Sequence, residues 1–93
     1  MPKLVFTHEV KDVNHWLSLH AERVEIFSKW ATDVQDYALA DGSKWVALTM
    51  DVHDMEAMKR DMETPEMDAA KARHGVVEPV HMFIASSVLE GTV

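Results

Sequence analysis

Residues 41–54, DGSKWVALTMDVHD, decide the fold of this chain. Its centre, Trp45–Val52, alternates as a strand does, so successive side chains point to opposite faces. One face is aliphatic and suits helix packing: Val46, Leu48, Met50 and Val52. Asp41-Gly42 is a turn dipeptide because glycine tolerates positive φ, and Asp54 is a favourable helix N-cap. The stretch therefore predicts a hairpin turn, a strand and a helix start in succession.

On the N-terminal side, the pattern predicts a strand over residues 5–10 and a weaker extended segment over 33–40 that pairs with residues 45–52. Between them, Asp12 caps a helix that runs from Val13 to about residue 31. Apolar residues recur there at three- and four-residue steps. They are Val13, Trp16, Leu17, Ala21, Val24 and Phe27.

On the C-terminal side, Met55, Met58 and Met62 share one face of a second helix. Proline lacks an amide and disfavours helix in the preceding residue, so a new helix is expected to begin at Pro65 with Thr64 as its cap. Gly75 is expected to end it as a left-handed C-cap. The last strand is predicted over residues 80–88.

The order strand, helix, strand, strand, helix, strand is that of the ferredoxin-like α+β fold. We expect one domain over residues 1–93, with a four-stranded antiparallel sheet of order 4-1-3-2 and the helices on one face.

The opposite face of this sheet carries Trp45 and Thr49 in one strand and His81 and Phe83 in another, so it is too apolar to be left in water. We therefore predict a homodimer in which a second sheet covers it. Aromatic cross-strand pairs favour a register that places Phe6 opposite Phe83, His8 opposite His81 and Leu4 opposite Ala85. A slip by one residue would put the two histidines on opposite faces.

The composition excludes several classes of site and partner. The chain has no cysteine, which excludes disulfides and thiolate sites and is compatible with a cytoplasmic location. Its net charge of −7 argues against nucleic acid as a partner. No apolar run approaches the roughly 20 residues that cross a membrane, and no hydrolase or nucleotide-binding motif is present.

Two segments, HEVKDVNHW (8–16) and DMEAMKRDMETPEMDAAKARHGVVEPVHMF (54–83), resemble small dimeric α/β-barrel proteins. That superfamily includes antibiotic biosynthesis monooxygenase-like and stress-responsive barrel domains. The resemblance implies a homodimer whose two sheets form a barrel with a pocket in each half. Members include cofactor-free monooxygenases, haem-degrading enzymes, cyclases and isomerases. Val52 and Lys71 stand where the haem-degrading branch has tryptophan and histidine, which argues against haem degradation.

The candidate catalytic residues are His8 and His81, because imidazole titrates near neutral pH and can donate or accept a proton. The alternative is that both are buried and satisfied by neighbours. A ligand-binding face is predicted from Phe6, Tyr37, Trp45, Thr49 and Phe83, some of which could equally be dimer core. His15 and His20 are five residues apart and diverge, so no metal site is predicted.

We therefore expect a barrel protein that binds a small apolar or aromatic molecule without a cofactor. The alternative is a cofactor-independent monooxygenase, or a related small-molecule enzyme, that uses a cavity histidine as general base.

Overall fold

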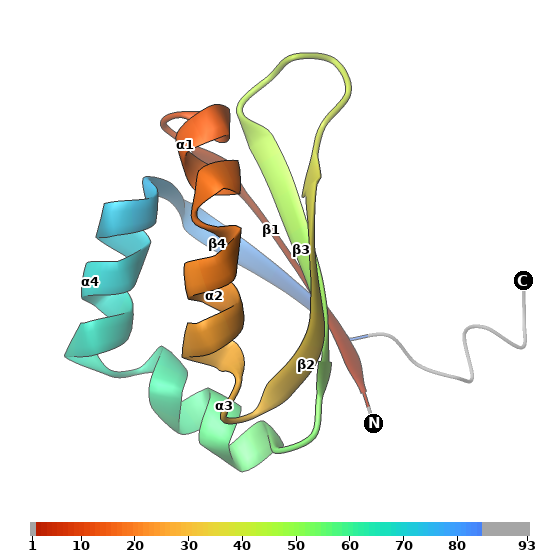
Figure 1. Ribbon diagram of the computed structural model, residues 1–93, viewed down its shortest axis with the longest axis vertical. Helices are drawn as coiled ribbons and strands as arrows, with labels where there is room; N and C mark the ends of the chain where they lie inside the picture. The colour runs from red at the N-terminus through yellow and green to blue at the C-terminus, as the bar shows by residue number, and fades with distance from the viewer. Residues whose placement is uncertain (1, 85–93) are drawn as a thin grey trace, which may run out of the picture.

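Four strands form one antiparallel sheet, and the helices all cover the same face of it (Figure 1). The computed structural model describes residues 2–84. Its elements are β1 (Lys3–Val10), α1 (Val13–Ser18), α2 (His20–Phe27), β2 (Ala31–Ala38), β3 (Trp45–Val52), α3 (Met55–Met62), α4 (Pro65–His74) and β4 (Val76–Ile84). The strand order is β2-β3-β1-β4, which is the predicted ferredoxin-like order read from the other edge.

The helix ends lie where the capping residues predicted them. The Asp54 carboxylate accepts a hydrogen bond from the Ala57 amide, and the Thr64 hydroxyl accepts one from the Met67 amide. Gly75 closes α4 in the left-handed conformation, at φ 75°. These local signals set the helix boundaries because each cap satisfies backbone groups that the helix itself cannot.

Several boundaries differ from the prediction. β1 begins at Lys3, two residues earlier than predicted, and β2 begins and ends two residues earlier. The first helix is broken at Leu19 into α1 and α2. The last strand begins at Val76, four residues earlier than predicted, because β4 is an edge strand in which Pro79 is tolerated. The predicted strand residues 85–88 lie outside the described part of the chain.

The predicted register between the first and last strands is wrong by one residue. Phe6 pairs with Met82, and Thr7 pairs with His81. Ala85, expected opposite Leu4, lies outside the described residues. The shift turns Phe6 and His8 toward the helices, whereas His81 and Phe83 lie on the opposite face. Burying one large apolar side chain contributes about 1.5 to 3 kcal/mol, more than the roughly 0.2 to 1 kcal/mol of a cross-strand pair, so core packing decides the register.

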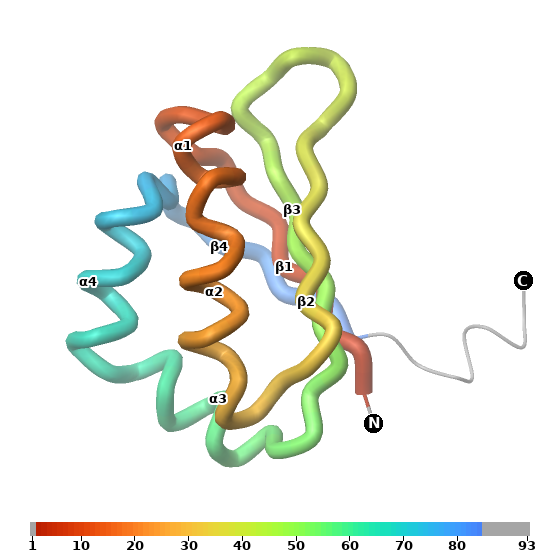
Figure 2. Tube along the Cα trace, viewed as in Figure 1, coloured from red at the N-terminus to blue at the C-terminus, as the bar shows by residue number. Residues whose placement is uncertain are grey.

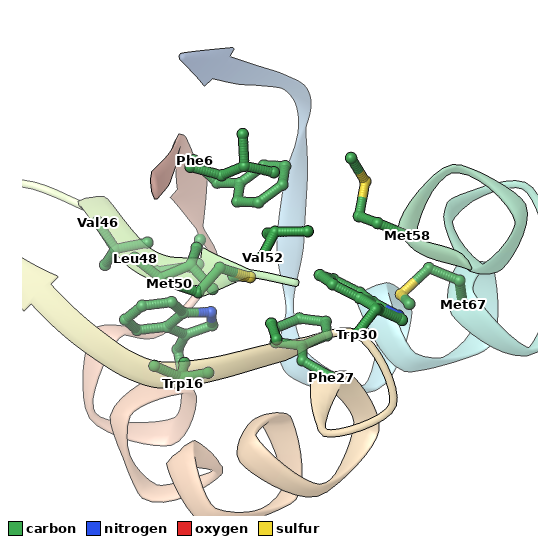
Figure 3. Packing of buried hydrophobic residues seen from close by; sticks show 14 residues of the cluster. Phe6, Trp16, Phe27, Trp30, Val46, Leu48, Met50, Val52, Met58 and Met67 are labelled. Carbon is green, nitrogen blue, oxygen red and sulfur yellow. The ribbon is translucent and has the colours of Figure 1, made fainter. Parts of the chain in front are cut away.

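The core fills the space between the sheet and the helices (Figure 3). The predicted aliphatic face of β3 is buried there from Val46 to Val52. Trp16 and Trp30 add the largest fully buried side chains. The chain trace in Figure 2 shows that the loop between β2 and β3 projects beyond the helices. All of these buried side chains lie between the sheet and the helices, so the core is confined to the helix-covered face of the sheet.

Candidate functional site

A cavity of about 260 Å³ lies within the helix-covered half of the molecule. Its walls come from three strands and all the helices. The apolar lining residues are Phe6, Trp16, Ile26, Phe27, Leu48, Met62, Met67, Ala70, Val76, Val80 and Met82, and the polar ones are His8, Arg23, Lys71 and His74. The cavity is thus mostly apolar with a few polar groups, which is the usual character of a small-molecule site.

His8 is positioned by an irregularity in the sheet. The partners of Thr7 and Glu9 on β4 are His81 and Val77, so three residues of β4 lie against the single residue His8. Such bulges re-aim side chains and are common beside active sites. The ring is 4% exposed and makes an edge-to-face contact with Trp16, with 5.9 Å between ring centroids. The bulge and the indole together hold the imidazole at the cavity wall.

One nitrogen of the His8 ring makes a hydrogen bond within the protein, and the other has no partner among the described residues. Nδ1 lies 2.9 Å from the Glu9 carbonyl oxygen, which can only accept, so Nδ1 carries the proton and donates it. Burial lowers the pKa of His8 below its ordinary value of 6.5, so the ring is neutral at pH 7. Within residues 2–84, Nε2 has no hydrogen-bond partner. His8 therefore presents a lone pair at the cavity wall.

Arg23 is a buried cation beside the cavity. Its Nη2 donates to Asp36 Oδ2 at 2.5 Å, and its guanidinium carbon lies 3.9 Å from the centroid of the Trp16 ring. Asp36 also accepts from His20 Nδ1 at 2.7 Å. The carboxylate neutralises the guanidinium in a nearly buried site, and the stacked guanidinium fixes the indole that contacts His8.

His74 joins this cluster to the protein surface. Arg23 Nη1 donates to His74 Nδ1 at 3.1 Å, so Nδ1 must hold a lone pair and the ring is neutral. Burial also lowers the pKa of His74. Its Nε2 lies 3.5 Å from Glu22 Oε1, and Glu22 is itself paired with Arg73. The Arg73 hydrogen bond lowers the pKa of the Glu22 carboxyl.

The structure separates the residues that the sequence analysis grouped. Phe6 and His8 line the cavity, whereas Tyr37, Trp45, Thr49, His81 and Phe83 lie on the other face of the sheet. Tyr37 Oη and Thr49 Oγ1 lie 3.4 Å apart there. The predicted convergence of the two histidines is therefore wrong, and the cavity lies on the helix side of the sheet.

Arg23 and His74 were missed because their sequence context is that of exposed helix positions. Arg23 stands among charged residues, and His74 follows Arg73 in a last turn where basic groups are common. One signal was available for Arg23. It lies seven residues after Trp16, the spacing that puts two residues on one face of a helical segment. For His74 no sequence signal exists.

Among residues 2–84, no group of three or more His, Asp or Glu residues is placed to hold a metal ion. No helix in the described part of the chain is long and apolar enough to cross a membrane.

Solved structures with the same arrangement of elements were then compared with the chain. A candidate antibiotic biosynthesis monooxygenase of Bordetella bronchiseptica superposes with a TM-score of 0.70 over 91% of this chain and 94% of its own, at 10% identity. A second candidate, from Caulobacter crescentus, gives 0.67 over 90% and 86%, at 12% identity. SnoaB, a cofactor-independent oxygenase from Streptomyces nogalater, gives 0.66 over 91% and 92%, at 16% identity.

The chain has the fold of the antibiotic biosynthesis monooxygenases. The resemblance read from the sequence is thereby confirmed at the level of the fold. No protein-family model matches the chain, and no curated protein does. At such low identity the shared fold does not determine the chemistry, which depends on the residues of the cavity.

The neutral buried histidines predict a stability that falls with acid. Below pH 6.5 the unfolded chain takes up protons at His8 and His74 that the folded chain does not, so the free energy of unfolding falls as the pH falls. Between pH 7.5 and 5.5 each histidine accounts for up to about 1.4 kcal/mol. The free energy of unfolding, measured with urea at pH 7.5 and at pH 5.5, should therefore fall less in His8→Phe than in the wild type. Parallel curves would contradict the assignment of a neutral His8.

Proposed function

We propose that the cavity binds a small, mostly apolar aromatic molecule that carries a hydroxyl group. The observation that carries the proposal is the free Nε2 of His8 at the wall of an otherwise apolar cavity. No cofactor is part of the proposal.

The size of the cavity supports a ligand of about two fused rings. A protein cavity of about 150 Å³ accommodates benzene, and this cavity is about 260 Å³. The rings of Phe6, Trp16 and Phe27 line it. Aromatic side chains favour stacked or edge-to-face contact with another ring, so a flat aromatic ligand fits the walls better than an alkyl chain does.

The tautomer of His8 selects the polar group of the ligand. Because Nδ1–H is held by the Glu9 carbonyl, Nε2 can only accept a hydrogen bond while the ring is neutral. A ligand that donates, such as a phenol or an enol, satisfies this nitrogen. An ether or a ketone of the same shape leaves it without a partner, at a net loss of about 0.5 to 1.5 kcal/mol.

Two matched probes test this binding function. 1-Naphthol donates a hydrogen bond, and 1-methoxynaphthalene is nearly the same shape but cannot. By isothermal titration calorimetry the wild-type protein should prefer 1-naphthol by about 2- to 12-fold, since one net hydrogen bond distinguishes the probes. His8→Phe should bind both and lose the preference. Failure of both probes to bind the wild-type protein would reject the function, and a preference that survives in His8→Phe would reject the role of His8.

The second candidate function is cofactor-independent oxygenation, favoured by the same lone pair. A neutral imidazole in a water-poor cavity can accept a proton from an enol or an activated CH₂ group. The resulting carbanion can react with O₂, so that the CH₂ group becomes a carbonyl and water is released. SnoaB is a cofactor-independent oxygenase with this fold.

An oxygen electrode distinguishes oxygenation from binding alone. 2-Tetralone is a two-ring ketone that enolises, so it provides both the donor and the acidic carbon. If the second function holds, protein-dependent O₂ uptake should match the ketone consumed and fall about 100-fold or more in His8→Phe, the usual contribution of a general base. Binding without uptake above the protein-free rate would exclude the oxygenase and leave the binding function.

We further propose that a second copy of the chain covers the open face of the sheet. Within the described residues no element packs on this face (Figure 1). It exposes Tyr37, Trp45 and Phe83, with Phe83 58% exposed. Large apolar side chains gathered on one face usually mark an interface, and aromatic residues are enriched in interfaces.

Light scattering tests the dimer. At micromolar concentration the wild-type protein should have twice the 10.6 kDa mass of one chain. Phe83→Asp should reduce this mass because it buries an unpaired charge in the interface. Val24→Asp, at an exposed residue of α2 on the helix side of the sheet, is a control that should leave the mass unchanged. A wild-type monomer would overturn the proposal.

A further inference from the structure

The charged groups around the cavity differ in how firmly their counter-ions hold them. Arg23 is bound by Asp36 at 2.5 Å, with side chains 4% and 7% exposed, so its charge is already matched inside the protein. Lys71 also lines the cavity, but its Nζ lies 3.6 Å from Glu78 Oε1. The Glu78 side chain is 67% exposed. Lys71 is therefore a cavity-lining cation with a loose counter-ion.

Lys71 stands where the cavity meets solvent. Its side chain is 31% exposed although it belongs to the cavity lining. Met82, which lines the cavity from the edge strand β4, is 47% exposed. Leu48 and Met67, deeper in the lining, are at most 7% exposed. An opening of the cavity, which we call the mouth, thus lies between α4 and β4, beside the ammonium group of Lys71.

The sheet irregularity brings this mouth close to His8. Glu78 is one of the three β4 residues that lie against His8, and its carboxylate is the partner of Lys71. The lone pair of His8 and the ammonium of Lys71 therefore belong to one stretch of the cavity wall. A molecule that reaches His8 through the mouth must pass the Lys71 ammonium.

An anionic group of a ligand at the mouth would replace Glu78 as the partner of the Lys71 ammonium, so one exposed ion pair would take the place of another. Glu78 can turn its exposed carboxylate to water at little cost, because ion pairs on the surface contribute little to stability. A ligand held by the cavity walls presents its carboxylate to Lys71 without the entropy cost of ordering a second long side chain. The chain's net charge of −7 disfavours anions elsewhere on the protein.

We propose that Lys71 is a specificity-determining residue that selects aromatic hydroxyl compounds bearing an acidic substituent, with Glu78 as the internal competitor for its ammonium. The inference rests on the proposed binding function and adds a second polar group to the ligand. The hydroxyl donates to His8 Nε2, the rings lie along the apolar walls, and the carboxylate remains at the mouth.

The test compares 6-hydroxy-2-naphthoate with its amide, 6-hydroxy-2-naphthamide, which has the same shape and no charge. Wild-type protein should bind the acid more tightly than the amide by about two- to fivefold at low salt, the ratio that corresponds to an ion pair of this kind. The ratio should fall toward one at 1 M salt, where charges are screened within about 3 Å.

Two single variants separate ligand selection from a structural role. Lys71→Gln should reduce the acid-to-amide ratio to one or below. Glu78→Gln should raise it above the wild-type value, because the competitor is gone and Lys71 remains. A purely structural ion pair predicts the same direction of change for both variants, since each breaks it. Opposite directions support the proposal, and equal directions overturn it.

The outcomes also separate this inference from the proposed function. If the amide binds and the acid gains nothing in the wild-type protein, the role of Lys71 is wrong and the binding function stands. If neither compound binds, both are wrong. The ratio for Lys71→Gln is taken between the two compounds within that variant, so a change in the shape of the cavity affects the acid and the amide alike. An acid-to-amide ratio in Lys71→Gln that equals the wild-type ratio would overturn the proposal.

Discussion

The ion pair between Arg23 and Asp36 is the interaction on which the site depends. It ties α2 to β2, and the guanidinium it fixes stacks on Trp16, the ring that in turn contacts His8. Two buried charges remain stable only as partners, because an isolated one would face the full cost of desolvation. Loss of either charge would therefore disturb the indole, the imidazole and the packing of α2 on the sheet together.

The balance between buried charge and apolar wall gives the cavity its character. Arg23 is matched by Asp36, and His8 and His74 are kept neutral by burial. The interior therefore carries almost no net charge and favours a neutral aromatic body. The polar groups that the cavity offers to a ligand are the lone pair of His8 and, at the mouth, the loosely paired ammonium of Lys71. The same small fold can host many chemistries because such groups are placed on a scaffold that does not specify them.

Local signals in the sequence predicted most of the fold. The alternation of Trp45–Val52 predicted both the limits of β3 and its buried face. Caps at Asp54, Thr64 and Gly75 predicted where α3 begins and where α4 begins and ends. The faces of β1 could not be predicted in this way, because both of its faces carry apolar residues. Phe6 fits either a core or an interface, and the pairing with β4 is shifted by a bulge that no local pattern announces.

The sequence by itself determined the order of elements, the strand order and the class of fold, since periodicity and capping act over a few residues and are legible locally. Only the tertiary structure decided which residues form the site. It brought Trp16, Arg23 and His74 to His8 and sent His81 to the other face of the sheet. His74 and His81 are far from His8 in the chain, so no local pattern relates them to it. A one-residue difference in register, set by the packing of the whole core, exchanges one face of the sheet for the other.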